Sequence, residues 1–278
     1  MSNIERLHHP SPRPSHRPDP PPLAMGERLI RVTIAERSME MHFQPIFDLK
    51  NGGVMGVEAL ARFARHPTRP PDEWFLEAAS VGRGVDLEIT ALNLALEQLD
   101  RLPAGLYLSL NATAETIQSE EFRATLDDVP AERIILELTE HVPVDDYRGL
   151  EAVIEGLRSK GLRVAVDDAG AGFSSLRHIL NLRPDVIKLD IDLIRGIDRD
   201  PTRQALGRAL LDFASEAYGA SIVAEGIETN AELETLRDLG CPCGQGFYLG
   251  RPERLPRVLP GPAVPESLWL PEDEALAL

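Results

Sequence analysis

Cysteine is scarce in this chain of 278 residues, which contains only Cys241 and Cys243. A single residue separates them, and this spacing is too tight for an unstrained disulfide bridge. The sequence therefore excludes a small secreted scaffold held together by disulfides. We expect two free thiols.

Long apolar runs are also missing. No segment approaches the roughly 20 consecutive apolar residues that a membrane-spanning helix needs. The N-terminus, MSNIERLHHPSPRPSHRPDPPP, lacks the apolar region of a secretory signal. These absences predict a cytoplasmic protein that does not engage a membrane.

Positive charge is in deficit, because 29 Lys and Arg residues stand against 45 Asp and Glu residues, giving a formal net charge of −16. Neutralising the phosphates of DNA or of an anionic membrane takes clustered Lys and Arg. We therefore expect no direct DNA binding, and a phosphate ligand would need metal ions beside it.

The two ends of the chain differ from its middle. Proline without apolar periodicity predicts a disordered leader over residues 1–25, and a Pro-rich acidic tail is predicted over residues 254–278. The scattered histidines of the leader are interpreted as solvated: His8, His9 and His16. The tail also contains three apolar residues: Leu268, Trp269 and Leu270. Two interpretations stay open for them. They dock on the domain or on a regulatory partner, or they belong to a loosely ordered terminus.

The predicted folded domain, residues 26–253, alternates short apolar segments with amphipathic helices. The eight strand candidates are HFQPIFDL, VMGVEALARF, LYLSLN, RIILELTE, LRVAVDD, DVIKLD, SIVAEG and GQGFYLG. Helix-end signals agree with this pattern: Pro201 behind Asp200, a Thr229 and Glu232 capping box, and C-cap glycines Gly161 and Gly240. The pattern predicts an α/β fold, a modified TIM (β/α)8 barrel. Because only KNGG separates the first two strands, we expect an antiparallel first strand.

Polar side chains stand at the ends of most of these strands, which is the functional edge of a parallel barrel. They are Glu58, Asn111, Glu137, Asp167, Asp168, Lys188, Glu225 and Gln245. One acid at a strand end commonly caps the next helix, but seven strands that bring such groups to one edge predict a site.

Converging carboxylates raise one another's pKa unless cations lie between them, so this site predicts metal binding. Carboxylate and amide oxygens favour Mg²⁺ or Mn²⁺ over Zn²⁺, and there are enough of them for two ions. Two such ions suit in-line displacement at phosphorus. Lys188 would hold the attacking water or the developing charge; the alternative is a salt bridge with Asp190 or an acid of the site.

The same residues resemble a known family. In order and approximate spacing, the segments FQPIFDLKNGGVMGVEALARF, LSLNAT, ILELTE, VDDAGAGFSSL, DVIKLD, IVAEGIET and LGCPCGQGFYLGRP are similar to the EAL domain. This bacterial signal-transduction family hydrolyses cyclic di-GMP, and the resemblance covers roughly residues 40–252. It implies a metal-dependent, cyclic-guanylate-specific phosphodiesterase that forms linear pGpG and pairs as a homodimer.

The resemblance also implies individual roles. The metal ligands would be Glu58, Asn111, Glu137, Asp167, Asp168 and Glu225, of which Glu58 and Glu225 also count as catalytic. Lys188 would orient the nucleophilic water, with Gln245 beside that water. The positions that contact the dinucleotide are Gln44 and Arg62. Glu140 matches an acid that steadies the loop after Asp168.

The chain departs from the family after the paired aspartates. The family commonly has DDFGTGYSSL, whereas this chain has Ala169, Ala171 and Phe173. In relatives this loop shapes the second-metal side and takes part in dimer coupling, so metal binding is expected to survive while the rate and the response to dimerisation stay open.

Two other functions remain as alternatives. A catalytically weak or inactive cyclic di-GMP receptor or protein-interaction scaffold would carry the same ligands. An enolase-like barrel would use Lys188 to abstract a proton beside a Mg²⁺-stabilised enediolate. The resemblance at Gln44 and Arg62 favours the dinucleotide over this second alternative.

Overall fold

The structure is a computed structural model that describes residues 25–64, 68–139, 144, 146–169, 173–257 and 259, without the side chains of Asp168, Phe173 and Ser174. The predicted leader, apart from Met25, and most of the predicted tail lie outside these residues. Within the described residues, no helix is both long and apolar enough to cross a membrane.

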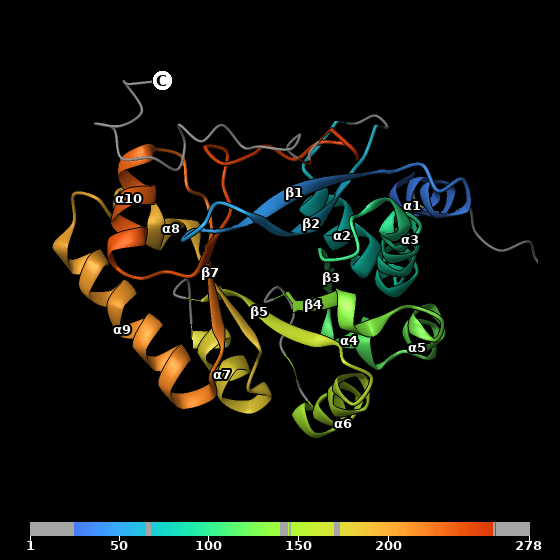
Figure 1. Cartoon of the computed structure of the whole chain (residues 1–278). Helices are drawn as coiled ribbons and strands as arrows, with labels where there is room; N and C mark the ends of the chain where they lie inside the picture. Colours follow the sequence, from blue (N-terminus) through green and yellow to red (C-terminus); the bar gives the residue numbers. More distant parts are fainter. Residues whose placement is uncertain are drawn as a thin grey trace, which may run out of the picture.

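Eight strands close a barrel in chain order (Figure 1). They are β1 (Glu40–Asp48), β2 (Val54–Arg62), β3 (Tyr107–Ala112), β4 (Ile134–Leu138), β5 (Arg163–Ala169), β6 (Val186–Leu189), β7 (Ser221–Ala224) and β8 (Cys243–Gly244). β1 runs antiparallel to both β2 and β8, and the remaining neighbours are parallel. The predicted barrel and its antiparallel first strand are confirmed.

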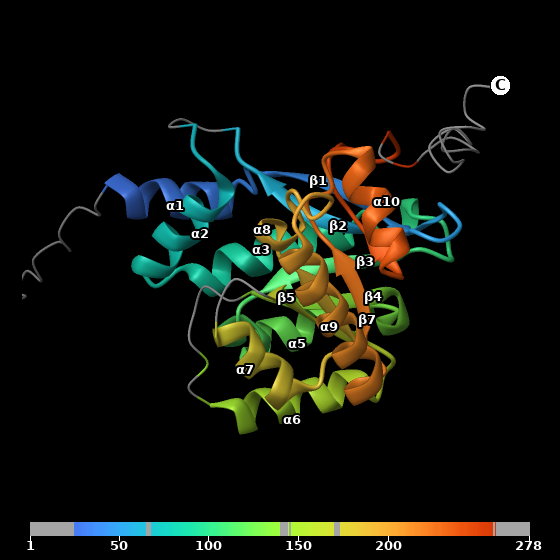
Figure 2. The ribbon, with the colours of Figure 1, turned by 90° about the vertical axis from the view of Figure 1, so that its left-hand side faces the viewer.

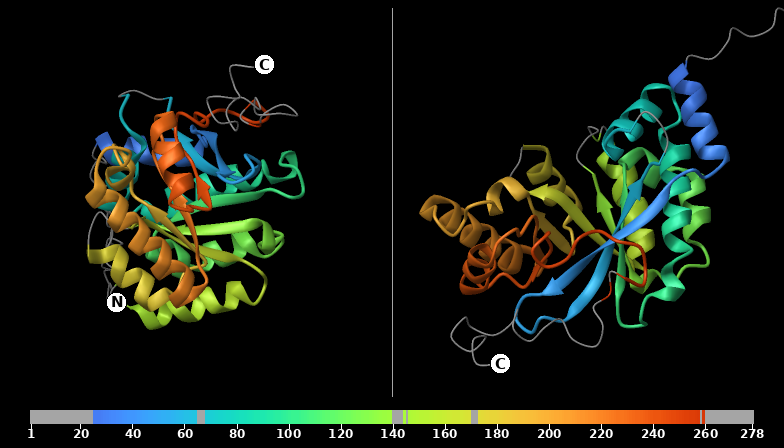
Figure 3. Two further views of the ribbon diagram at one scale, coloured as in Figure 1. Left: turned by 60° about the vertical axis from the view of Figure 1, so that its left-hand side comes forward. Right: turned by 90° about the horizontal axis from the view of Figure 1, so that it is seen from above.

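Helices cover the outside of the barrel (Figures 1 and 2). They are α1 (Met25–Ala35), α2 (Pro71–Ser80), α3 (Gly84–Leu96), α4 (Ala114–Gln118), α5 (Glu120–Leu126), α6 (Tyr147–Arg158), α7 (Phe173–Leu182), α8 (Ile191–Ile194), α9 (Pro201–Tyr218) and α10 (Asn230–Asp238), with short 3-10 turns at Leu99–Arg101 and Ala131–Arg133. Seen from above, the blue-to-green helices lie on one side of the strands and the yellow-to-red helices on the other (Figure 3).

The predicted helix ends are confirmed. The Asp200 side chain accepts from the backbone N–H groups at the start of α9, and Thr229 and Glu232 form the capping box of α10. Gly161 and Gly240 have positive φ angles of 99° and 80°, which a residue with a Cβ rarely adopts. Local sequence signals therefore determine where these helices begin and end.

The prediction for the last strand was wrong in extent. GQGFYLG was predicted as a strand, but β8 ends at Gly244 and the chain turns back beyond it, where Gly250 N donates to Gly246 O. A Cβ on Gly246 would overlap with the backbone of Ile227. This close approach to the loop after β7, with Tyr248 N donating to Ile227 O, leaves no room for an extended strand.

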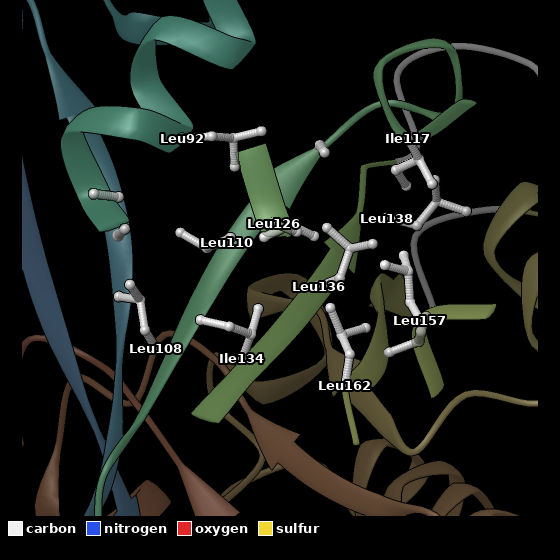
Figure 4. Close-up of a cluster of buried hydrophobic side chains, with 14 of the residues drawn as sticks. Leu92, Leu108, Leu110, Ile117, Leu126, Ile134, Leu136, Leu138, Leu157 and Leu162 are labelled. Atoms are coloured by element: carbon white, nitrogen blue, oxygen red, sulfur yellow. The ribbon is translucent and has the colours of Figure 1, made fainter. Parts of the chain in front are cut away.

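The two largest apolar clusters of the described residues lie between the strands and the helices. Figure 4 shows the larger one, in which Leu108, Leu110, Ile134 and Leu136 of β3 and β4 meet side chains such as Leu92 of α3. The second cluster packs β5, β6 and β7 against α7, α8, α9 and α10. Burial on both sides of the barrel is what positions its strands.

Alternate residues of each strand point into the barrel. Toward the amino ends of the parallel strands, the interior of the barrel is apolar and contains Ile46, Tyr107, Ile135, Ala165, Val186, Val223 and Cys243. The next inward positions, toward the carboxyl ends of the parallel strands, are polar: Ser109, Glu137, Asp167 and Lys188. An apolar plug therefore supports a polar layer directly above it.

Candidate active site

Lys188 lies at the centre of the polar layer and is 1% exposed. Its Nζ atom is 2.7 Å from Glu137 Oε2 and 2.7 Å from Glu225 Oε1. The same atom is 3.4 Å from Glu58 Oε2 and 3.6 Å from Asp167 Oδ1. Closure of the barrel thus brings acids from β2, β4, β5 and the end of β7 to one ammonium group.

Two amide side chains complete this cluster. Asn111 Nδ2 donates to Glu58 Oε1 at 2.9 Å. Gln245 Nε2 donates to Glu58 Oε2 at 2.7 Å and to Glu225 Oε1 at 3.0 Å. The other amide atom, Gln245 Oε1, is buried and has no hydrogen-bond partner among the described residues. It is an acceptor without a donor, which is costly unless a ligand or water supplies one.

Ser109 belongs to the site but was missed by the sequence analysis. It is buried in β3, and its Oγ donates to Glu137 Oε1. The two oxygens of Glu137 are therefore fixed from opposite sides by Ser109 and Lys188. The signal was available, because Ser109 lies two residues before Asn111 and shares its face of the strand.

Burial raises the pKa of Glu137 to about 8. The negative charges of Glu58 and Asp167 act in the same direction, and Lys188 opposes them. Burial also raises the pKa of Glu225 well above its ordinary value, against the charge of Lys188. Both carboxyl groups consequently hold protons more tightly than exposed glutamates do.

Burial acts to raise the pKa of Glu58, but Lys188 and the hydrogen bonds from Gln245 and Asn111 outweigh it and hold that pKa below its ordinary value. Burial acts to lower the pKa of Lys188, yet the surrounding acids raise it well above the ordinary value. One ammonium group thus faces four carboxyl groups, an excess of acid that bound cations would offset.

A pocket of about 370 Å³ opens beside this cluster. Glu58 and Asn111 line it on the cluster side, and Phe75 and Leu76 of α2 form part of its apolar wall. Arg62, at the end of β2, also lines the pocket and is half-buried. A cation and apolar side chains therefore border the same space as the carboxylates.

Glu88 of α3 lines the pocket, and no sequence pattern predicted it. Its Oε2 accepts from Thr113 N at 2.9 Å and from Thr113 Oγ1 at 3.1 Å. Burial raises the pKa of Glu88, against these hydrogen bonds. No local pattern marks this residue, because its environment comes from the loop after β3, 25 residues further along the chain.

The remaining predicted residues are placed as follows. Gln44 lies opposite Glu58 in the β1–β2 register, and its Nε2 donates to Gly250 O at 3.1 Å. Asp190 caps α8 by accepting from Asp192 N, while Lys188 pairs with the acids of the site. Outside the described residues or side chains lie Glu140, Asp168, Ala171 and Phe173.

Two further residues noted in the sequence are buried in packing roles. Ala169 is fully buried in the cluster between β5 and the outer helices. Cys241 and Cys243 are free, as predicted, and both are buried. Cys241 Sγ donates to Cys243 O at 3.3 Å, and Cys243 belongs to the apolar plug of the barrel.

The chemistry of the donors fits hard divalent cations, since the cluster offers carboxylate and amide oxygens, including the unpartnered Gln245 Oε1. In the part of the chain that the structure describes, however, no three acidic, His or Cys side chains surround a common point as in a formed metal site. Instead, carboxylate oxygens of Glu137 and Glu225 form ion pairs with Lys188 Nζ. A cation would therefore compete with this ammonium group for them.

Comparison with known proteins assigns a family to this chain, because the family model described as EAL domain matches residues 27–252. The cyclic di-GMP phosphodiesterase NbdA of Pseudomonas aeruginosa is 30% identical over 243 residues, which are 83% of this chain and 31% of NbdA. The cyclic di-GMP phosphodiesterase PA2567 of the same organism is 32% identical over 229 residues, 78% of this chain and 39% of that relative.

A solved structure described as PaMucR phosphodiesterase in complex with c-di-GMP superposes with a TM-score of 0.74 at 29% identity, covering 85% of this chain and 100% of that one. This chain spans only about a third of the length of the curated relatives. The family match nevertheless includes every strand that contributes to the lysine-centred cluster. This chain therefore belongs to the EAL domain family.

Proposed function

We propose that this chain hydrolyses cyclic di-GMP to linear pGpG with two Mg²⁺ or Mn²⁺ ions, and so lowers a bacterial second messenger. The observation that supports this proposal best is the group of four acids around Lys188, joined by Asn111 and Gln245, next to a pocket of about 370 Å³. The names of NbdA and PA2567 as cyclic di-GMP phosphodiesterases support the substrate.

The ions would be held by side chains at the carboxyl ends of the strands: Glu58, Asn111, Glu137, Asp167, Asp168 and Glu225. When bound, such ions neutralise charge on a phosphodiester and lower the pKa of the attacking water. The unpartnered Gln245 Oε1 would accept a hydrogen bond from that water.

Lys188 would orient the water, because its ammonium group is held by acids on several sides and cannot swing away. The carboxylates of Glu58 and Glu225 lie close enough to Lys188 to take the proton that the water loses. Arg62 offers planar paired donors that match the oxygens of a phosphate. Gln44 would contact the dinucleotide from β1.

A catalytically weak or inactive cyclic di-GMP receptor is the second candidate. One observation favours it: the described acids surround an ammonium group rather than an open metal position. The enolase-like alternative gains no support, since the relatives reported above are named for phosphodiester chemistry.

We further infer that the protein acts in the cytoplasm as a homodimer, with its tails available to a regulatory protein partner. Leu176 and Leu180 of α7 support the dimer, because they are 40% and 61% exposed one helical turn apart. Light scattering on the protein with metal and cyclic di-GMP tests this inference, and a monomer under those conditions would refute it.

The experiment for the main proposal incubates purified protein with cyclic di-GMP and Mg²⁺ or Mn²⁺, and separates the products by chromatography. Ca²⁺ and a chelator serve as controls. Formation of pGpG only with the active metals is the expected result. No product, together with ligand binding measured by calorimetry, would instead assign the chain to the receptor class.

A further inference from the structure

Glu232 of α10 is a buried carboxylate that the proposed chemistry does not use, and it is only 4% exposed. Its capping box accounts for one hydrogen bond, from Thr229 N to Glu232 Oε2 at 3.0 Å. Two more backbone groups donate to it: Glu228 N to Oε2 at 3.0 Å and Gly196 N to Oε1 at 2.9 Å. This side chain therefore does more than cap its own helix.

The donors come from two separate loops of the active-site edge. Gly196 follows α8, which directly follows the strand that carries Lys188. Glu228 and Thr229 belong to the loop after β7, which begins with Glu225. One carboxylate thus joins the segments that follow Lys188 and Glu225, whose Nζ and Oε1 atoms lie 2.7 Å apart in the cluster. Each of the two carboxyl oxygens thus accepts from the backbone of a different segment.

The loop after β7 also supports the last member of the cluster. Ile227 N donates to Gln245 O at 3.1 Å. Gly226 has a φ angle of 69°, and a Cβ there would overlap with the Ile191 side chain of α8. The loop is packed with no spare space, so a displacement of its backbone would reach both Glu225 and Gln245.

We propose that Glu232 is a positioning residue for the active site: its carboxylate locks the loops after β6 and β7 together and so holds Glu225 against Lys188 and Gln245. This inference rests on the proposed function, which gives Glu225 and Lys188 their catalytic roles. Small misplacements of reacting groups cost large factors in rate, so the effect is measurable.

The test compares Glu232→Gln with Glu234→Gln. Glutamine keeps the size of Glu232 but has one acceptor oxygen, so at least one backbone N–H faces an NH₂ group. Glu234 lies on the same helix with a side chain that is 46% exposed, and its variant removes the same charge. We expect Glu232→Gln to lower kcat about 10-fold or more and to change KM by less than about 2-fold. Glu234→Gln should stay within about 2-fold of wild type in both constants.

A second readout separates positioning from general destabilisation. Calorimetric titration with Mn²⁺ should show about 5-fold weaker binding for Glu232→Gln than for wild type. Because Glu232 is proposed to act through Glu225, the double variant Glu225→Gln/Glu232→Gln should bind Mn²⁺ no more weakly than Glu225→Gln alone. Unfolding midpoints confirm that each variant is folded at the assay temperature. Should Glu232→Gln not fold, Glu232→Asp, which keeps two acceptor oxygens one methylene group further back, carries the same test with a smaller expected loss.

An unchanged kcat in the folded Glu232→Gln variant would overturn the positioning role. So would a result in which Glu232→Gln weakens Mn²⁺ binding equally in wild type and in the Glu225→Gln variant. Either result in an otherwise active wild type refutes this inference alone. Absence of turnover and of Mn²⁺ binding in the wild type itself would refute the proposed function and the positioning role with it.

Discussion

Lys188 Nζ lies 2.7 Å from Glu137 Oε2, and the two side chains are 2% and 1% exposed. A buried pair of this kind costs several kcal/mol of desolvation per ion, which its mutual attraction only partly returns. A further acid, Glu225, lies equally close to the ammonium group. The barrel therefore keeps this cluster at the expense of stability, as is expected where charged groups serve a reaction.

Lys188→Ala should abolish hydrolysis, lowering kcat on the order of 10²- to 10⁴-fold, because the variant loses the group that we propose to orient the water. Glu137 and Glu225 can take up protons once the ammonium group is gone, so the barrel should remain folded. Binding of cyclic di-GMP in Ca²⁺, measured by calorimetry, should stay within about 5-fold of wild type. Retained hydrolysis would mean that the role of Lys188 is misassigned.

Divalent metal should stabilise the protein through Glu58. Mg²⁺ or Mn²⁺ at 100 times its dissociation constant should add about 2.7 kcal/mol to the free energy of unfolding, visible as a higher Tm. Glu58→Ala should remove both this Tm shift and the turnover, since Glu58 contacts Asn111, Gln245 and Lys188. Glu97→Gln, at an exposed position on the outer surface, is the control and should keep the shift. A shift that persists in Glu58→Ala would place the metal elsewhere.

Arg62→Ala should raise KM about 10-fold or more with a smaller change in kcat, because the pocket loses the donor that we propose for a phosphate oxygen. Arg62→Lys keeps the charge but lacks the planar pair of donors, and should recover only part of the loss. Steady-state kinetics at saturating metal measure both variants. An unchanged KM in Arg62→Ala would argue against a substrate contact.

The two thiols should be inert in the native protein at pH 8. Burial raises the pKa of Cys241 to about 12, and that of Cys243 is also raised by burial. The reactive thiolate of Cys241 therefore forms only as the pH approaches 12. Because its folded pKa lies above its unfolded value, the stability linked to this group is fully present below about pH 8.5 and is lost as the pH rises through 12.

An aromatic disulfide reagent such as DTNB checks this prediction. At pH 8 the folded protein should show negligible reaction over minutes, while protein unfolded in guanidinium chloride should release two equivalents per chain. Rapid reaction of the folded protein would mean that this part of the barrel opens readily.

Much of the fold follows from short-range patterns in the sequence. KNGG between two apolar segments predicted the antiparallel pair, and Gly52 within it has a φ angle of 75°. The strand candidates LYLSLN and RIILELTE predicted that Asn111 and Glu137 stand at one edge of the barrel, and the two residues are paired in the register of β3 and β4. These features depend on residues a few positions apart, so the local sequence contains the information.

The tertiary structure alone decided which groups meet. Ser109 of β3 donates a hydrogen bond to Glu137 of the neighbouring strand β4, and Glu88 accepts one from Thr113 in the loop after β3. The turn at Gly246 is imposed by the backbone of Ile227, which belongs to the loop after β7. The capping box predicted that Glu232 would contact Thr229, but not its bond to Gly196, 36 residues away. The sequence by itself determined seven of the strands, the helix ends and the polar residues at one edge of the barrel, because backbone sterics and periodicity act locally. Which charges became partners was decided only when the barrel closed, because that choice depends on contacts between segments far apart in the chain.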